Sequence, residues 1–535
     1  MEPDMKEHLK SAIGNFTRFG DTDIFPYPIE RYVFYDLFDE ALKLFEEIHG
    51  DFGGSLSKYP VIQDGSLVAV NYFGYRWATQ IDPIWNTYLL ALVISIGQEI
   101  EAARIPVDRK VIYSYRFSPN PDSHLLFEPD SGWRQFQERS LELSQDAGYV
   151  LVCDISDFYP RVYHHSLENA LDRATKNKEA IRRIMIILGT LSARRSYGLP
   201  VGGPAARLLG ELVLNGVDRL LLAEGITFCR FVDDYHFFAN SEEEAYCQLI
   251  LLNEKLLRNE GLSLQKAKTR LMTASEFRTT SELSSEYISG DRAEDRGFFS
   301  LRIHYDPYSE TADEDYQSAK EAVNQYNIHE ILLKELAKGR VQRLRASQIV
   351  RHIRYMREPG RSPSVLTLLD NFQKLYPVFP LVMITLKEVV VELDEASRLR
   401  VFDALRELAR KGAHIIQIPI NLAYLVRVLS HDKSVETDQV LNQIYRSSSS
   451  MMLRRDVILA MARRKADFWI REEKNNFATL NLWERRAMVI ASYVLGDEGK
   501  FFRNHIKNDL SPFDQIVRDW AADKKKISGR LELPL

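Results

Sequence analysis

Cysteine is scarce in this chain. Only three cysteines occur among 535 residues, Cys153, Cys229 and Cys247, and no two of them form a CxxC pair. A disulfide framework needs an even set of cysteines, and a structural zinc site needs cysteines or histidines at close, paired spacing. The sequence therefore excludes both kinds of site and favours a reducing compartment such as the cytoplasm.

Long apolar runs are also missing. No stretch approaches the roughly eighteen apolar residues that span a bilayer, and the most apolar candidates, such as LLALVISIG, are too short. The first residues, MEPDMKEHLK, lack the apolar core of a signal peptide. We therefore expect a cytoplasmic protein with no membrane partner.

An excess of positive charge is absent as well. The formal net charge is −5 and the pI is about 6.2. A protein that coats long duplexes through phosphate contacts usually carries a large positive charge, so the overall balance disfavours that class. Hydrophobic residues at 45% and charged residues at 27% are instead typical of a folded globular protein.

Two parts of the chain have different patterns. Residues 1–305 mix β-prone runs with helical stretches and turns, which indicates an α/β domain. Residues 306–535 are nearly all helical in pattern, and one core rarely fills a chain of this length. The predicted fold class is thus α+β, with two domains that meet at residue 305. The clearest helical segments of the second part are 316–338, 363–374, 394–410, 452–464 and 482–496.

Short breaks with Pro, Gly or Ser separate these helical segments, which predicts paired helices stacked in an array. No clean repeat period is present, so the likeness to a HEAT-like helical-repeat domain is one of packing. One stretch of this part, from Lys334 to Arg361, has nine Lys or Arg and two acidic residues. It predicts either a helix that follows phosphates or a solvated helix face, and the sequence does not separate the two.

The first candidate for chemistry is YVLVCDISDFYPRVYHH at 149–165. Strand-forming residues lead up to Asp154, which puts its carboxylate at a strand end where an ion could reach it. A strand-terminal aspartate is more often a turn former or a helix cap. This segment alone therefore does not predict a catalytic role for Asp154.

The second candidate is ITFCRFVDDYHFFA at 226–239. Asp233 and Asp234 lie between two apolar, β-prone runs, which predicts a hairpin with the acidic pair at its tip. Hairpin turns prefer Asn-Gly or Asp-Gly, whereas Asp-Asp sets two like charges side by side and has no glycine for positive φ. A bound cation would explain this arrangement.

Together, Asp154, Asp233 and Asp234 predict a metal centre. Mg²⁺ prefers oxygen ligands, and it takes one or two protein carboxylates while its other positions bind water and substrate phosphates. Two ions about 3.5–4 Å apart can activate an attacking hydroxyl and stabilise a leaving pyrophosphate oxygen. The pattern thus predicts nucleotidyl transfer with two Mg²⁺ ions, and with Mn²⁺ as an alternative.

A glycine-rich segment, YGLPVGGPAARLLGELVLNGVDRLL, separates the two acidic candidates. Its glycines Gly198, Gly202 and Gly203 precede a long amphipathic helix that is predicted to begin near Pro204. Glycine lets the backbone approach a phosphate or a base pair closely, but a glycine-rich helix entry can also be a simple turn.

A fourth segment, LRNEGLSLQKAKTRL at 257–271, follows the acidic pair. It predicts a helix that ends at Gly261 and then a strand that bears Lys266 and Lys268. A lysine at this place could balance triphosphate charge, although surface lysines without such a role are much commoner.

Taken in order, the four segments resemble motifs A, B, C and D of reverse transcriptases through DISDFY, GLPVGGP, FVDD and LSLQKAKT, within roughly residues 60–290. Their order makes the resemblance specific, because a tandem Asp-Asp alone occurs often by chance. The resemblance implies the fingers and palm of a right-hand polymerase. Asp154 would be the motif A metal ligand, and Asp233 and Asp234 the motif C pair.

The resemblance also implies substrate contacts. Tyr159 would be the aromatic gate under the sugar, where its ring would clash with a ribose 2′-hydroxyl and so select deoxynucleotides. Asp157 and Phe158 would lie along the incoming triphosphate, chiefly through their backbone. Gly202 would let the chain approach the substrate, and Lys268 would balance its charge.

Two places depart from the family pattern. Motif C is FVDD where the family has YxDD, and motif B has Val201 where many members carry Gln. These changes leave the handling of a template open. An earlier segment, VIYSYRF at 111–117, resembles a fingers strand whose Arg116 would reach the triphosphate, and a surface salt bridge is the alternative for this arginine.

The segment FGDTDIFPYPIERYVF at 19–34 and the helical second part resemble the bacterial abortive-infection and defence-associated reverse transcriptases of the AbiK type. This resemblance implies antiphage defence by a homo-oligomeric enzyme that makes DNA from dNTPs. It also implies priming on a protein hydroxyl, without a template or with a noncoding RNA. Of 25 tyrosines, Tyr27, Tyr72 and Tyr75 are weak candidates for the primer.

The sequence leaves two alternative functions. A catalytically silent palm could act as an RNA- or protein-binding scaffold. The presence of all three predicted metal-binding aspartates disfavours this alternative. A nucleotide cyclase can also have a palm-like fold with two metals, but the glycine-rich segment and Tyr159 fit that activity poorly.

Overall fold

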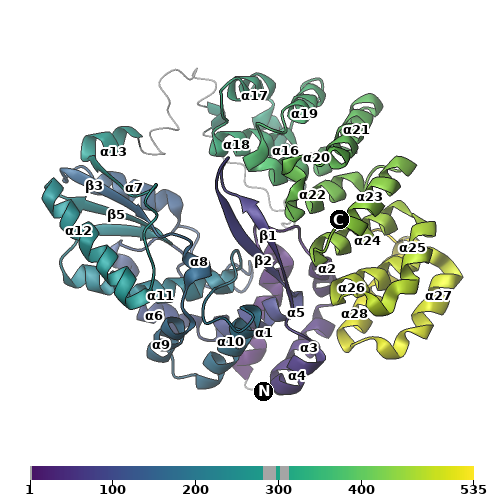
Figure 1. Cartoon of the computed structure of the whole chain (residues 1–535), viewed down its shortest axis with the longest axis horizontal. Coiled ribbons are helices and arrows are strands. Elements are labelled where there is room, and N and C mark those ends of the chain that lie inside the picture. The colour runs from purple at the N-terminus through teal and green to yellow at the C-terminus, as the bar shows by residue number, and fades with distance from the viewer. Residues whose placement is uncertain (1–2, 281–296, 300, 302–311, 530) are drawn as a thin grey trace. The chain divides into compact units, whose positions relative to one another are not determined.

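The computed structural model describes residues 3–280, 297–299, 301, 312–529 and 531–535. These residues form two compact units (Figure 1). The first unit contains residues 1–63 and 78–288, and the second contains residues 64–77 and 289–535. A segment of the predicted first domain, residues 64–77, thus groups with the helical second part. The predicted boundary at residue 305 lies outside the described residues.

The first unit is built on a four-stranded antiparallel sheet with the strand order β4-β5-β3-β6. Strand β3 pairs with β5 along its whole length, from Tyr149 opposite Ala239 to Asp154 opposite Asp234. Asp154, at the end of β3, and Asp234, at the start of β5, therefore lie side by side at one edge of the sheet. The strands are β3 (Tyr149–Asp154), β4 (Phe228–Phe231), β5 (Asp234–Ala239) and β6 (Arg270–Thr273).

Helices cover this sheet. Helix α12 (Glu242–Lys255) contacts β3 and β5, whereas α7 (Trp133–Leu143) contacts β4 and α13 (Ala274–Thr280) contacts β3 and β6. Side chains of α7, α13 and the strands share one apolar core. Its buried members are Phe136, Val150, Cys229, Phe238, Ala274 and Phe277. The three cysteines of the chain are unpaired, as the sequence predicted.

A bundle of helices completes the first unit. Helix α5 (Pro83–Ser95) is buried from Pro83 to Ile94, since it contacts α1 (Pro3–Phe19), α10 (Lys178–Leu191) and α11 (Pro204–Ala223). Such burial on every side explains why its sequence is apolar all round. Among the described helices, none is long and apolar enough to cross a membrane.

The second unit is mostly helical, and alternate helices contact one another. Helices α18, α20, α22, α24, α26 and α28 each contact the next in this series, and α17, α19, α21 and α23 form a second series (Figure 1). Their bounds are α17 (Ile328–Leu336), α18 (Arg343–Ile353), α19 (Arg361–Asp370), α20 (Phe379–Val389), α21 (Glu395–Lys411), α22 (Pro419–Leu429), α23 (Val435–Ser447), α24 (Met451–Arg464), α26 (Leu482–Ala491) and α28 (Pro512–Ser528).

The predicted helical segments of this part are present with small changes. The segment 316–338 holds two helices, α16 (Ala312–Val323) and α17, because Asn327 caps a new helix by accepting a hydrogen bond from the Glu330 amide. Helices α25 (Asp467–Glu473) and α27 (Gly496–His505) complete the described set.

Ion pairs engage much of the basic stretch between Lys334 and Arg361. Lys338 lies 2.5 Å from Glu335, Arg354 lies 3.0 Å from Glu388, and the Arg361 guanidinium lies 2.5 Å from Glu392. For these residues the structure favours a solvated or paired helix face over a phosphate-binding helix.

The second unit also contains a β-hairpin. Strands β1 (Gln63–Ala69) and β2 (Tyr75–Ile81) form a two-stranded sheet, and residues 64–77 of it belong to this unit. Near the base of the hairpin, the Asp64 carboxylate accepts hydrogen bonds from the Ser450 hydroxyl at 2.5 Å and the Met452 amide at 2.8 Å. The hairpin is thereby tied to the start of α24.

Candidate active site

The structure brings the three predicted aspartates together. Asp154 is the last residue of β3, and its partner in the register is Asp234, the first residue of β5. Phe231 pairs with Asp234 across the hairpin of β4 and β5, which leaves Val232 and Asp233 as the connecting turn. The Ile155 amide donates to the carbonyl oxygen of Asp233 at 3.0 Å, so the turn is fastened to the end of β3.

The like charges of these aspartates repel one another. Asp154 is only 6% exposed. Burial and the negative charge of Asp154 raise the pKa of Asp233 to about 6, although its own backbone and Lys268 act in the opposite direction. A carboxylate with a raised pKa beside a second carboxylate favours a bound cation.

A lysine side chain of the protein lies next to this cluster. The Lys268 ammonium lies 2.6 Å from Oδ2 of Asp154. Burial lowers the pKa of Lys268, but the hydrogen bond and charge of Asp154, with the charges of Asp234 and Asp233, outweigh burial and raise it overall. Lys268 therefore stays protonated next to the carboxylates.

The local structure at Lys268 differs from the predicted strand. Lys266 and Lys268 lie in a turn that precedes β6, in which the amide of Lys268 donates to the carbonyl of Gln265 at 3.0 Å. The amide of Gln265 in turn donates to the Asp154 carbonyl at 2.7 Å. This contact with the end of β3 bends the chain into a turn and places the lysine at the carboxylates. The predicted helix end at Gly261 is present, with φ at +68°.

The side chains of this cluster are chemically suited to bind metal ions, although their present arrangement is not that of a formed metal site. Within the described residues, no group of three or more His, Cys, Asp or Glu side chains is arranged as a ready metal site. The available donors are nevertheless carboxylate oxygens, the ligands that Mg²⁺ and Mn²⁺ prefer. The Lys268 ammonium shows that Asp154 is oriented to bind a positive charge. The two-metal site stays a prediction.

Tyr159 lies close to the acidic turn. The half-buried ring has its pKa raised well above the usual value by burial, and by the charges of Tyr115, Glu211 and Asp233. A glycine on α11 makes room for it, since a Cβ atom on Gly210 would lie 3.1 Å from the rings of both Tyr159 and Phe158. The predicted gate is therefore held against α11, next to Asp233.

The two residues before Tyr159 have different surroundings. Asp157 is exposed, has φ at +49° and lies 3.6 Å from the Arg161 guanidinium. Phe158 is 2% exposed, so its side chain belongs to the core. Contact with a triphosphate through the backbone, as predicted, is compatible with both positions.

Arg116 is not where the prediction requires it. Its side chain is 3% exposed and its guanidinium lies 2.9 Å from Glu101. The predicted strand at 111–117 is also missing, because only isolated bridges form at Ile112 and Phe117 and because Tyr115 has φ at +45°. Both expectations are corrected: burial in an ion pair keeps this arginine from reaching a triphosphate in this structure.

Gly202 has a packing role in the structure. Its φ is +113°, and a Cβ atom there would lie 3.1 Å from Cβ of Thr22 and 3.2 Å from Cδ1 of Ile24. The glycine thus lets the segment before α11 pack on residues of the 19–34 segment. The structure gives no contact of Gly202 with the aspartates, so its predicted substrate role is unsupported. The helix start at Pro204 agrees with the prediction.

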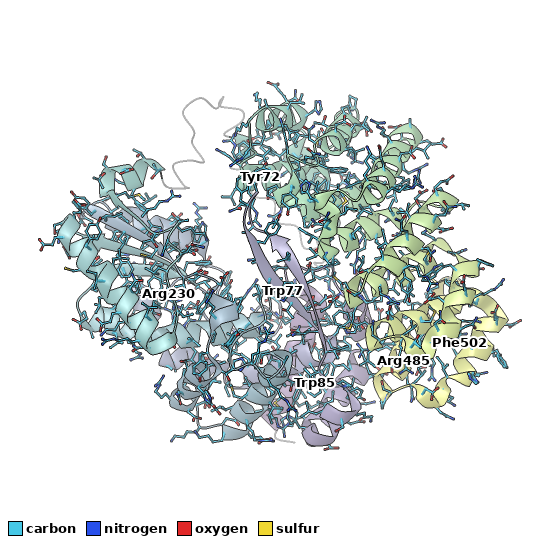
Figure 2. All side chains as sticks on the ribbon, viewed as in Figure 1. Tyr72, Trp77, Trp85, Arg230, Arg485 and Phe502 are labelled. Carbon is cyan, nitrogen blue, oxygen red and sulfur yellow. The ribbon has the colours of Figure 1, made fainter. Side chains whose placement is uncertain are left out.

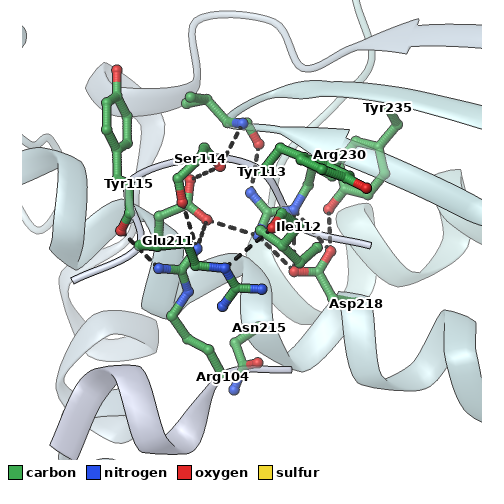
Figure 3. Close-up of polar contacts among 12 residues, drawn as sticks. Arg104, Ile112, Tyr113, Ser114, Tyr115, Glu211, Asn215, Asp218, Arg230 and Tyr235 are labelled. Atoms are coloured by element: carbon green, nitrogen blue, oxygen red, sulfur yellow. Dashed lines mark hydrogen bonds and ion pairs between the residues drawn. The ribbon is translucent and has the colours of Figure 1, made fainter. Parts of the chain in front are cut away.

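A buried ion-pair network, which sequence reasoning missed, supports the acidic turn (Figure 3). Arg230 on β4 lies 2.6 Å from Asp218 and 3.0 Å from Glu211, and both acids project from α11. The same guanidinium donates to the carbonyl of Val232 at 2.7 Å. The amide of Val232 donates to the Ser114 hydroxyl at 2.9 Å.

This network fixes a strained residue. Val232 has φ at +56°, which is rare for a β-branched residue and marks local strain. Both of its backbone polar groups are bonded, and the acids that hold Arg230 are themselves bonded to Arg104, Ser114 and Tyr235. The sequence carries one signal for it: Glu211 and Asp218 lie seven residues apart, and so on one face of the amphipathic helix.

Arg207 is a second cation that sequence reasoning missed. It lies in the first turns of α11, with its guanidinium 2.9 Å from Asp23 and 5.1 Å from the ring centroid of Tyr115. Its charge also acts on Tyr159. Of the two arginines, Arg116 and Arg207, the second is the one beside the predicted gate.

The candidate primer tyrosines have engaged side chains. The Tyr72 hydroxyl donates to the Lys374 carbonyl at 2.6 Å and accepts from the Val341 amide, and the Tyr75 hydroxyl lies 2.5 Å from that of Tyr376. Tyr27 is 38% exposed, with the Arg31 guanidinium 4.4 Å from its ring centroid. None of these contacts favours one of the three as a primer.

Comparisons with known proteins bear on the first unit. Residues 107–296 match the family described as reverse transcriptase (RNA-dependent DNA polymerase), and this range contains Asp154, the acidic turn and Lys268. A comparison with curated proteins gave no match.

Two solved structures are similar at low scores. One is telomerase from Candida albicans in complex with a TWJ fragment of telomeric RNA, with 9% identity over 80% of this chain and 68% of that chain and a TM-score of 0.31. The other is apo telomerase from Candida tropicalis, with 10% identity over 75% of this chain and 71% of that chain and a TM-score of 0.31. Scores of this size do not establish a shared fold. By sequence, the segment 107–296 is similar to reverse-transcriptase domains.

Proposed function

We propose that this protein is a DNA polymerase of the reverse-transcriptase type. The observation that carries the proposal is the meeting of Asp154, Asp233 and Asp234 at one sheet edge, inside the range that matches the family. The carboxylates would hold two Mg²⁺ or Mn²⁺ ions, which when bound would activate the attacking hydroxyl and neutralise the leaving pyrophosphate.

Other side chains have supporting roles in this proposal. Tyr159, which packs on Gly210, would be the gate whose ring excludes a ribose 2′-hydroxyl and so favours deoxynucleotides. Arg207, beside Tyr159, takes the place that the sequence assigned to Arg116 as the cation nearest the incoming phosphates. Lys268, which pairs with Asp154, would help to balance the charge of the triphosphate.

The biological setting of the proposal comes from the resemblance of residues 19–34 and of the helical part to defence-associated enzymes. We propose a cytoplasmic, homo-oligomeric antiphage polymerase whose second unit is a HEAT-like helical-repeat domain. The stacking of alternate helices supports this relationship. Synthesis would be primed by a protein hydroxyl and proceed without a template or on a noncoding RNA.

The test is incorporation of labelled dNTPs by the full-length protein, purified with any RNA that accompanies it, in Mg²⁺ or Mn²⁺. We expect label in long chains or in a covalent protein adduct, and none with Asp233→Ala. A matched control is Asp172→Ala, which removes an exposed aspartate of α9 (His164–Ala174) that pairs only with Lys178 at 2.7 Å. Equal incorporation by wild type and Asp233→Ala would contradict the proposal.

A catalytically silent palm that acts as an RNA- or protein-binding scaffold is the second candidate. One observation favours it: the Lys268 ammonium lies 2.6 Å from a carboxylate oxygen of Asp154, where a metal ion would bind. Phage protection that survives the double change Asp154→Ala and Asp234→Ala would support the scaffold and exclude the polymerase as the cause of protection.

A further inference from the structure

The tip of the β1–β2 hairpin exposes large aromatic side chains. Phe73 is 75% exposed, Tyr75 46% and Trp77 56%. Tyr75 and Trp77 are two residues apart on β2 and so lie on the same face of the strand. Figure 2 shows Trp77 on the hairpin and Tyr72 at its tip, near α18. We call the rings of Phe73, Tyr75 and Trp77 the hairpin platform.

Hydrogen bonds close the turn at the tip of the hairpin. The Asn71 side chain accepts from the amides of Phe73 at 2.8 Å and Gly74 at 2.5 Å, which closes the turn. The Val70 amide donates to the Gly74 carbonyl at 2.9 Å, and the Val70 carbonyl accepts from Arg343 at 3.0 Å. The aromatic rings are therefore presented on a fixed support, and a ligand would lose little chain freedom on binding.

Packing beneath the platform is also defined. Trp77 lies over Gly65 of the opposite strand, since a Cβ atom on that glycine would come within 2.3 Å of the indole ring. Tyr75 is held by its hydroxyl contact with Tyr376, with the two ring centroids 6.3 Å apart. One side of these rings is thus supported by protein, and the rest remains exposed to solvent.

Three arginines of the hairpin and of the 334–361 stretch have no acidic partner among the described residues, and they do not share one face. Arg76 lies between Tyr75 and Trp77 on β2, so its side chain points to the opposite face of the strand. The Arg340 guanidinium lies 4.4 Å from the ring centroid of Phe73. The pKa of Arg343 is lowered by burial and by the positive charge of Arg76. Among the residues that the structure describes, no carboxylate lies within ion-pair distance of Arg76, Arg340 or Arg343. Most other Lys and Arg residues between Lys334 and Arg361 have acidic partners. The positive charge near the hairpin is therefore not compensated by carboxylates.

Exposed aromatic rings with arginines nearby that lack acidic partners are typical of surfaces that bind single-stranded nucleic acid. Unpaired bases stack on aromatic side chains, and arginines neutralise the phosphates between them. A duplex hides the faces of its bases and would leave the rings exposed. An apolar peptide would cover the rings but would not neutralise three arginines.

We propose that the hairpin platform, with Arg76, Arg340 and Arg343, binds single-stranded DNA. The choice of DNA over RNA rests on the proposed function, because a polymerase that uses deoxynucleotides produces such a strand. Binding itself depends only on groups of the second unit and does not require an intact catalytic centre.

The experiment measures binding of a fluorescein-labelled single strand of about 20 nucleotides, longer than one stacking site needs, to the full-length protein by anisotropy. The Asp233→Ala protein without dNTPs serves as background, so that no strand is extended. We expect Phe73→Ala and Trp77→Ala each to weaken binding by about fivefold or more, the range for loss of one stacked base. The control is Phe501→Ala, an equally exposed ring, 76% exposed, elsewhere in the same unit.

Arg340→Ala provides a second, independent variant. It should lower the affinity and reduce the slope of log affinity against log salt by about one unit. Because Trp77 packs on Gly65, thermal unfolding of each variant is measured beside binding, and Phe73→Ala keeps the test valid if Trp77→Ala unfolds.

Three results would overturn the proposal: unchanged affinity in Phe73→Ala and Arg340→Ala, an equal loss in Phe501→Ala, or tighter binding of the same sequence as RNA. Failure of the proposed function is distinguishable. A protein that binds single-stranded DNA through the platform but never incorporates dNTPs would refute the polymerase and keep the platform as a binding site. A protein that incorporates dNTPs with unaltered binding in the variants would refute the platform alone.

Discussion

The ammonium of Lys268 lies 2.6 Å from the carboxylate of Asp154, across 114 residues of sequence. Both Asp233 and Asp234 also act electrostatically on this lysine. A single side-chain cation therefore offsets part of the negative charge that the aspartates gather at the sheet edge. In the proposed enzyme, metal ions and Lys268 compete for the same oxygen atom.

Removal of that lysine should tighten metal binding. We expect Lys268→Met to bind Mn²⁺ several-fold more tightly than wild type at pH 8, where the carboxylates are ionised, because no ammonium has to be displaced. Catalysis should fall, since the same cation would later face the triphosphate. Titration calorimetry gives the affinity, and Lys266→Met, on the same turn, is the control. Weaker Mn²⁺ binding in Lys268→Met would mean that the lysine orients the carboxylates instead of competing with the ion.

Metal affinity should depend on pH through Asp233. Its pKa in the metal-free protein is about 6, against an ordinary value of 3.8. Below about pH 6 a proton therefore occupies this carboxylate and competes with the ion, so Mn²⁺ affinity should fall as the pH drops from 8 to 5. An affinity that is constant across this range would contradict the assignment of Asp233 as a ligand.

The same shift has a consequence for the metal-free protein. Between pH 3.8 and about 6 the folded state binds more protons at Asp233 than the unfolded state does. The contribution of this group to stability therefore decreases as the pH rises through that window. Asp233→Asn should remove this component, which comparison of melting temperatures across the window would detect.

Arg230 should be essential for the stability of the first unit. Arg230→Met leaves Glu211 and Asp218 without their shared cation inside the protein, a loss of about 3–5 kcal/mol for a broken buried pair. Thermal unfolding should shift accordingly, and activity should fall because Val232 loses a bond at the acidic turn. Addition of Asp218→Leu should recover part of the stability. A melting temperature equal to that of wild type would show that the network is not needed for folding.

Tyr159 should set the choice of sugar. Tyr159→Ala opens the space between the acidic turn and Gly210, so we expect incorporation of ribonucleotides relative to deoxynucleotides to rise by an order of magnitude or more, since a steric clash of this kind corresponds to at least about 1.4 kcal/mol. Competition between labelled rNTPs and dNTPs measures the ratio. Tyr163→Ala, an exposed tyrosine of the same segment, is the control. An unchanged ratio would remove Tyr159 from the role of gate.

Several local features could be predicted from the sequence. The strand that ends at Asp154, the hairpin that carries Asp233 and Asp234, and the helix starting at Pro204 are all present. Alternating β-branched and aromatic residues, a proline at the first helical position and a run of helical periodicity act over short distances, and they needed no tertiary information.

Local signals failed where a distant segment changed the outcome. The turn at Lys268 replaces a predicted strand because Gln265 bonds to the end of β3. Arg116 is buried because Glu101, on α6 (Gly97–Ala103), lies within ion-pair distance. Neither partner is visible in the sequence around the residue concerned.

The sequence by itself thus determined which strands and which turn carry the three aspartates, since these elements follow from residue type and short-range pattern. Only the tertiary structure decided what each charge meets: Asp154 meets Lys268, Arg230 meets Asp218, and the hairpin at 64–77 joins the helical unit. The physical reason is that burial and pairing of charges depend on segments that are distant along the chain, and the energy of a charge is set by its surroundings in space.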